Sequence, residues 1–129
     1  MKPENNTECL FCKIAKGEIK SDFIYEDDNF FAIYDIDPIT PGHAMVIPKN
    51  HYKTFIDIPN TMGLELLDAI KKVTLKIISE TQAESFNLMV VGEDVSHVHI
   101  HVIPRKKGDG IKPLVNLNRI AQVSEKAEI

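Results

Sequence analysis

Apolar residues recur along the chain with two periods, which predict one long helix and several short strands. The helix is expected to begin at Pro59-Asn60-Thr61, with Asn60 or Thr61 as its N-cap, and to run for about 20 residues. Spacings of three and four within it predict one face packed in a core. The residues on this face are Leu66, Ile70, Val73 and Ile77, with Leu67, Thr74 and Ile78 beside them.

The other apolar segments are short, as expected for the strands of a small sheet. Residues 23–35 predict a hairpin, because Asp27-Asp28-Asn29 is a turn sequence between two apolar segments. Three further strands are predicted over residues 43–48, 86–91 and 95–104, and a short helix over residues 11–15. This order predicts an α+β fold, with an antiparallel sheet of about five strands and one long helix packed on it.

Length and composition are typical of one globular domain. The chain has 129 residues, of which 43% are apolar and 26% charged. We expect a flexible leader over residues 1–8, the domain over residues 9–107, and a tail over residues 108–129 that packs on the domain or is partly disordered. The polar start shows no secretory signal, and no apolar run reaches the ~20 residues of a membrane helix.

Charge limits the classes of partner. The formal net charge of −4 provides no electrostatic footprint for duplex nucleic acid. We therefore expect no nucleic-acid partner. The absence of a targeting signal and of a membrane-length apolar run leads us to expect a cytoplasmic protein with no membrane partner. The short basic run at residues 105–107 is interpreted as a solvated turn, the alternative being a rim that attracts phosphate.

Three histidines alternate with apolar residues in the last predicted strand. Residues 97–103 read His-Val-His-Ile-His-Val-Ile. Alternate side chains of a strand share a face, so neighbouring imidazoles would lie about 6.5–7 Å apart on one side. Three interpretations compete: a solvated polar face, a single metal held by all three imidazoles, or phosphate chemistry with one histidine as the nucleophile.

The residues around these histidines resemble the histidine triad (HIT) family, whose signature is three histidines alternating with apolar residues. Pro104-Arg105 after the last histidine fits the same pattern. The likeness extends over roughly residues 9 to 107. It includes Cys9-Leu10-Phe11-Cys12, Gly17-Glu18-Ile19, Tyr25-Glu26-Asp27-Asp28, Asp35-Ile36-Asp37-Pro38, Thr40-Pro41-Gly42-His43 and Val46-Ile47-Pro48-Lys49.

The resemblance implies a HIT-like fold and a role for each matching residue. His99 would be the nucleophile, forming a nucleotidyl-histidine intermediate, and His101 would contact the phosphate. His97 completes the catalytic set. Asp35 would accept hydrogen bonds from the ribose hydroxyls, although it is also a candidate turn residue. The remaining nucleotide-binding residues would be Leu10, Phe11, Ile14, Ile33 and Ile36 around the base, with His43 and Glu93.

The pair Cys9 and Cys12 is by itself a weak metal signal. The zinc-bearing branch of the family pairs such cysteines with two histidines, which match His51 and His97 here. The resemblance therefore implies a structural zinc site of Cys9, Cys12, His51 and His97, with no open position for water. The alternative is two buried free thiols and an exposed His51.

The chain departs from the family pattern before the triad. Many members carry an Asn and a Gly-Gln pair there, whereas this loop is short and has Glu93 where Gln is usual. A carboxylate repels phosphate, so Glu93 either points away or is held protonated as a proton donor. Backbone amides of the Gly92 turn are a possible replacement. The chain also lacks the C-terminal Trp that some members use, because it contains no Trp.

The implied activity is hydrolysis or transfer of a nucleoside monophosphate group, from nucleoside phosphoramidates or dinucleoside polyphosphates. The partner would be a purine nucleotide or nucleotide conjugate, and the implied assembly is a homodimer with joined sheets. The departure at Glu93 keeps open a catalytically weak, regulatory nucleotide-binding protein. A metal hydrolase built on three histidines is the other alternative.

Overall fold

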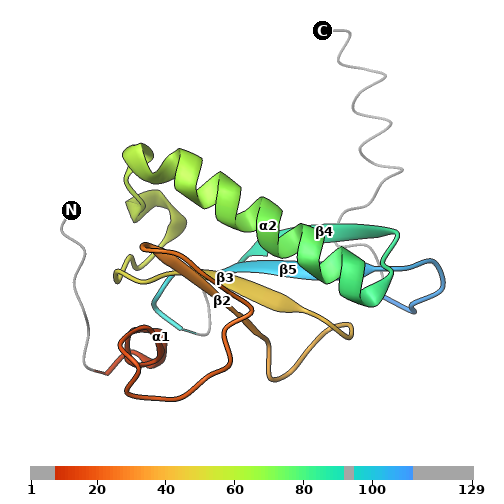
Figure 1. The fold of residues 1–129 in the computed structure, drawn as a ribbon, viewed down its shortest axis with the longest axis horizontal. Helices are drawn as coiled ribbons and strands as arrows, with labels where there is room; N and C mark the ends of the chain where they lie inside the picture. The colour runs from red at the N-terminus through yellow and green to blue at the C-terminus, as the bar shows by residue number, and fades with distance from the viewer. Residues whose placement is uncertain (1–7, 92–94, 112–129) are drawn as a thin grey trace, which may run out of the picture.

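The computed structural model describes residues 8–91 and 95–111, and in this part a five-stranded antiparallel sheet lies between two helices (Figure 1). The long helix crosses one face of the sheet, and the short helix lies on the other. In chain order the elements are α1 (Leu10–Ala15), β1 (Tyr25–Glu26), β2 (Phe30–Tyr34), β3 (Ala44–Pro48), α2 (Gly63–Thr81), β4 (Ser85–Val90) and β5 (Ile100–Arg105). The strand order is β1-β2-β3-β5-β4. The predicted α+β fold is thus confirmed.

One hydrophobic core fills the space between α2 and the sheet. Side chains of a strand point alternately to its two faces, so every second residue of the central strands reaches this layer. The strands contribute Phe30, Ala32, Ala44, Val46, Ile100 and Val102, and α2 contributes Leu66, Ala69, Val73 and Ile77. The predicted helix face was therefore largely right, but it omitted Ala69 and included Leu67, whose side chain is 55% exposed.

The opposite face of the sheet carries α1 and a second core. Its strand residues are Phe31, Ile33, Met45 and Ile47, and they pack against Cys9, Phe11, Cys12 and Ile14. This face also carries His101, because His101 alternates with Ile100 and Val102 along β5. The candidate chemistry is consequently placed on the side of the sheet away from α2.

The turns of the sequence are held by short polar side chains, as expected for Asx residues. Asp27 Oδ1 accepts hydrogen bonds from the backbone amides of Asn29 and Phe30, both at 2.8 Å, which closes the predicted hairpin between β1 and β2. The predicted start of α2 was wrong by a few residues. Residues Asn60–Met62 form a separate 3-10 turn, and the N-cap is Met62, with no side-chain hydrogen bond.

The last strand is shorter than predicted. Pairing begins at Ile100, whereas residues 95–99 precede the strand. This segment is bonded to the loop after β3 and not to a neighbouring strand, since the amide of Val98 donates to the carbonyl of Tyr52 at 2.8 Å. His97 and His99 are therefore held by the loop after β3 and not by the sheet ladder. Within the described residues, no helix is long and apolar enough to span a membrane.

Candidate active site

A cleft of about 470 Å³ opens between α1, the loop before β1 and the end of β2. Eight of the residues predicted to bind nucleotide line it: Leu10, Phe11, Ile14, Ile33, Asp35, Ile36, His99 and His101. Seven further residues line the cleft that the sequence did not predict: Ile19, Lys20, Ser21, Tyr34, Asp37, Met45 and Val95. Met45 could have been found from strand parity, because it pairs with Ile33 in the sheet. Lys20 and Ser21 lie in a loop, where no periodicity points to a face.

His99 is held in a defined tautomer at the inner end of this cleft. Its Nδ1 lies 2.8 Å from the backbone carbonyl oxygen of His97. A carbonyl oxygen can only accept, so Nδ1 carries the hydrogen and donates it. The lone pair of the neutral ring is then on Nε2, which is the atom available to attack an electrophile. The side chain is 3% exposed, so its orientation is maintained by packing as well.

His101 is oriented through His43, which is 58 residues away in sequence. The backbone amide of Ile39 donates to Nδ1 of His43 at 3.0 Å, so this nitrogen has no hydrogen. The hydrogen of the neutral His43 ring must be on Nε2, which lies 2.8 Å from Nδ1 of His101. His101 therefore accepts at Nδ1 and carries its own hydrogen on Nε2. This chain of donors makes His101 a hydrogen-bond donor at Nε2, suited to a phosphate oxygen.

Burial keeps His43 neutral. Desolvation lowers the pKa of His43 below its ordinary value, and the carboxylate of Asp35 opposes this shift. Asp35 Oδ2 lies 3.6 Å from Nε2 of His43 and 3.7 Å from Nδ1 of His101. His43 does not line the cleft itself, so the structure places it behind His101.

Asp35 combines the two roles that the sequence left open. Its Oδ1 accepts a hydrogen bond from the backbone amide of Asp37 at 2.9 Å, which is the predicted turn interaction. The same side chain lines the cleft, where its carboxylate can accept hydrogen bonds from a diol. The turn aims the carboxylate, and the ribose role stays a prediction.

A second cluster lies beside the cleft and contains all four predicted metal ligands. Donor atoms of Cys9, Cys12, His51 and His97 all lie within 4.8 Å of one another. Cys12 Sγ is 3.2 Å from Nδ1 of His51 and 3.4 Å from Nδ1 of His97, and Cys9 Sγ is 3.3 Å from Nδ1 of His97. The two cysteines are not joined by a disulfide.

These donors fit a tetrahedral zinc ion. Zn–S and Zn–N bonds of ~2.3 and ~2.05 Å at tetrahedral angles imply sulfur–nitrogen separations of about 3.5 Å, close to those observed. His97 also has the outer hydrogen bond that a metal-ligating imidazole needs, because its Nε2 donates to the carbonyl of Pro48 at 2.7 Å. Burial lowers the pKa of His97 to about 4, which keeps the ring neutral for ligation.

The three histidines do not converge on one point. His97 turns its Nδ1 to the thiols and its Nε2 to a carbonyl, whereas His99 and His101 line the cleft. The expectation of three imidazoles along one strand was wrong, because His97 and His99 precede β5 and are not part of its ladder, but all three rings lie on the side of the sheet that carries α1. Among the described residues, no cluster of potential metal ligands contains all three histidines. Glu93 lies outside the described residues.

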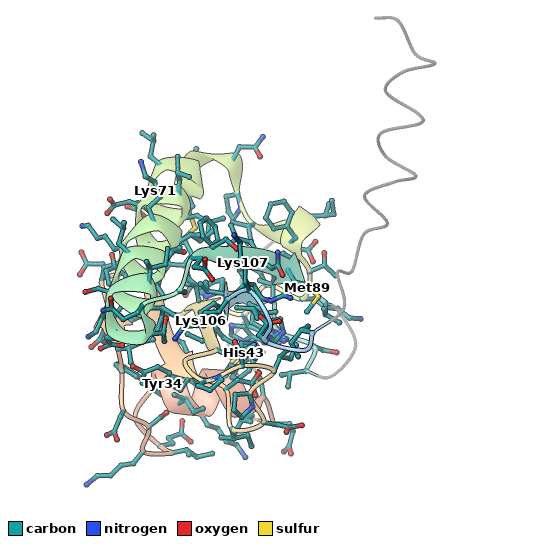
Figure 2. The ribbon with its side chains drawn as sticks, turned by 90° about the vertical axis from the view of Figure 1, so that its right-hand side faces the viewer. Tyr34, His43, Lys71, Met89, Lys106 and Lys107 are labelled. Atoms are coloured by element: carbon teal, nitrogen blue, oxygen red, sulfur yellow. The ribbon has the colours of Figure 1, made fainter. Side chains whose placement is uncertain are left out.

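The basic run after β5 is partly neutralised within the chain. Arg105 donates to both carboxylate oxygens of Asp109, at 2.7 and 3.1 Å, and to Oδ1 of Asn87 at 2.7 Å. Its guanidinium is therefore engaged in the turn and unsuited to bind phosphate. Lys106 and Lys107 on the same turn are exposed, and both are labelled in Figure 2.

Comparison with known proteins agrees with this geometry. The HIT domain model matches residues 16–108. The chain is 36% identical over 117 residues to an adenylylsulfatase of Arabidopsis thaliana, an alignment covering 87% of this chain and 59% of that protein. It is 34% identical over 111 residues to an adenosine 5'-monophosphoramidase of Candida albicans, covering 79% of this chain and 73% of that protein.

Solved structures share the fold. A HIT family member from Bacillus subtilis superposes with a TM-score of 0.76 at 30% sequence identity, covering 92% of this chain and 96% of that one. The order of strands, the histidine segment and the matched domain lead to one conclusion. This chain belongs to the HIT domain family.

Proposed function

We propose that this protein hydrolyses nucleoside monophosphate conjugates, with His99 as the nucleophile. The observation that carries the proposal is the hydrogen bond from Nδ1 of His99 to the carbonyl of His97, which leaves the Nε2 lone pair at the inner end of an apolar cleft. A nucleophilic imidazole must be oriented with its free nitrogen toward the electrophile, and this bond fixes the orientation and the tautomer of the ring without a charged partner.

The chemistry proceeds by two displacements. Nε2 of His99 attacks the phosphorus, and the bond from phosphorus to the leaving nitrogen or oxygen breaks. Its electron pair departs on the leaving group, and a leaving nitrogen takes up a proton from water. The product is a nucleotidyl-histidine. Water then attacks the phosphorus and loses a proton to solvent. The bond between Nε2 and phosphorus breaks with its electron pair on Nε2, which releases the nucleoside monophosphate and restores the neutral imidazole of His99. His101 donates its Nε2 hydrogen to a phosphate oxygen throughout, which offsets charge at the reacting centre.

The nucleoside part is held by the rest of the cleft. Apolar side chains from α1 and β2, including Phe11, Ile14 and Ile33, form a surface on which a purine can pack. Asp35 accepts from the ribose hydroxyls. The two named relatives, an adenylylsulfatase and an adenosine 5'-monophosphoramidase, support an adenosine conjugate as the substrate.

The test compares wild type with His99→Ala on adenosine 5'-phosphoramidate, adenylyl sulfate and a diadenosine polyphosphate, with AMP release as the readout. Wild type should release AMP from at least one compound, and the variant should be reduced at least ~10³-fold, as for loss of a covalent nucleophile. The compound with the highest kcat/KM identifies the leaving group. AMP binding without turnover of any compound would instead support the regulatory alternative.

We also propose that Cys9, Cys12, His51 and His97 hold a structural zinc ion. Four protein donors complete a tetrahedral shell, so the ion would organise the chain and take no part in bond cleavage. Elemental analysis of the purified protein should find one zinc per chain. Wild type with no bound metal would contradict this assignment.

The sheet edge at β4 is the surface we propose for a homodimer. Phe86, Leu88 and Val90 of β4 are 42%, 47% and 46% exposed, and β4 is the last strand of the sheet in the described part of the chain. An edge strand with an apolar row is open to further pairing. Antiparallel pairing of β4 with its own copy is self-complementary, as a two-fold interface must be.

Light scattering after gel filtration tests this assembly. Wild type should have the mass of two chains, and Leu88→Lys should shift it to the mass of one, because the charge would be buried at the interface. Leu75→Lys is the control, since Leu75 is an exposed leucine of α2. A monomeric wild type would overturn the proposed dimer.

A further inference from the structure

The metal cluster and the nucleotide cleft share two pieces of chain, namely α1 with its N-cap and residues 97–99. From this sharing we propose that metal binding at the cluster and nucleotide binding in the cleft are thermodynamically linked, each strengthening the other. The proposal rests on the function proposed above, because it concerns the same cleft. It gives the cluster a role in setting nucleotide affinity, in addition to holding the fold.

Helix α1 is the first shared piece. Cys9 is its N-cap and Cys12 lies in its first turn, and between them Leu10 and Phe11 line the cleft. A helix of six residues is too short to be stable alone, so its position depends on what anchors it. Fixing the two sulfur atoms on a metal would therefore fix the wall against which the base packs.

His97 is the second shared piece. Its ring is held between the thiols at Nδ1 and the carbonyl of Pro48 at Nε2, and it is fully buried. Its backbone carbonyl is the acceptor that determines the tautomer of His99. His97 therefore has both roles: its side chain is a candidate metal ligand, and its backbone carbonyl is the hydrogen-bond partner of His99.

Phe11 joins the two pieces. Its ring packs edge-on against His97 and His99, with centroids 5.8 and 5.1 Å apart, and the same ring lines the cleft. A base bound against Phe11 would hinder movement of both imidazoles. The linkage thus passes through direct contacts and needs no distant conformational change.

Linkage is reciprocal, so it has two measurable consequences of equal size. Loading the cluster should raise the affinity for AMP, and AMP should raise the affinity of the cluster for zinc by the same factor. We expect the higher zinc affinity to be expressed as slower zinc release. We expect a factor of about ten, within the range usual for coupled sites.

The primary experiment measures zinc release from the loaded wild-type protein to a chromogenic chelator, with and without saturating AMP. AMP should slow release about tenfold. Inorganic phosphate at the same concentration is the control, because it lacks the base that would pack on Phe11 and should leave the rate unchanged. This measurement starts from the folded, loaded protein, so it remains decisive even if the stripped protein unfolds.

The second experiment weakens the cluster without altering either shared piece. His51 is the most exposed of the four ligands and belongs to the loop after β3. His51→Ala should lower AMP affinity about tenfold at limiting zinc, and excess zinc should restore most of that loss. Lys53→Ala is the matched control, since Lys53 is exposed in the same loop and should behave as wild type.

The outcomes separate this proposal from the proposed function. Equal release rates with and without AMP, together with an AMP affinity that zinc does not alter, would overturn the linkage and leave the function intact. Absence of AMP binding under all conditions would overturn the function and the linkage together. Reduced AMP affinity in His51→Ala that zinc does not restore would assign the loss to local structure and refute the linkage.

Discussion

The side chain of His43 makes two hydrogen bonds, and an asparagine or a glutamine at this position can each reproduce one of them. Its Nδ1 accepts from the amide of Ile39, and its Nε2 donates to Nδ1 of His101. An asparagine places its carbonyl oxygen near the Nδ1 position but does not reach His101. A glutamine places its amide nitrogen near the Nε2 position. His43→Asn therefore keeps the loop contact and loses the contact to His101, and His43→Gln does the reverse.

The size of the effect follows from burial. His43 and His101 are 2% and 9% exposed, so water cannot readily replace a lost partner. Leaving a buried polar group unsatisfied costs about 1–3 kcal/mol. A misoriented His101 should stabilise the transition state less, by about 1–2 kcal/mol. This loss lowers kcat about 5- to 30-fold in His43→Asn. His43→Gln should retain kcat within about threefold while it loses stability to a similar degree.

The assay measures kcat and KM for AMP release by both variants, alongside urea unfolding to verify that each is folded. His43→Asn should lower kcat with little change in KM, because His43 does not line the cleft. The reasoning is refuted if both variants lose kcat equally, or if His43→Asn retains full activity.

Three further predictions follow from the same geometry. Burial lowers the pKa of His43 below 6.5, so the unfolded chain binds more protons in acid. The urea midpoint should be highest above pH 6.5 and fall below it, less steeply in His43→Asn. Asp35→Asn keeps an acceptor for the Asp37 amide but loses the carboxylate that accepts from both ribose hydroxyls, so it should reduce the preference for AMP over 2',3'-dideoxy-AMP in binding titrations; a preference retained in full excludes the ribose role. Arg105→Gln should lower the melting temperature without changing KM, because Arg105 binds Asp109 within the turn; a raised KM would place Arg105 at the phosphate.

Local patterns were sufficient to predict most of the secondary structure. Short apolar segments bounded by turn residues identified β2 and β3 as strands, because such patterns are local. The structure then decided which of their residues face each core. The spacing in α2, which is also a local pattern, identified its buried face, apart from Ala69, whose small side chain carries little apolar signal. These predictions depend only on neighbours in the sequence. The predicted start of β5 was wrong because the backbone amide of Val98 donates to the carbonyl of Tyr52, which is 46 positions away in the sequence.

The sequence by itself determined the chemistry present: alternating histidines, two closely spaced cysteines, and a carboxylate after an apolar strand. Only the tertiary structure decided how these groups divide into sites. It turned the ring of His97 to the thiols and its carbonyl to His99, and it joined His43 to His101 across 58 positions. The physical reason is that tautomer and ligation depend on hydrogen-bond partners. Those partners come from distant segments, which meet only when the sheet and its two cores form.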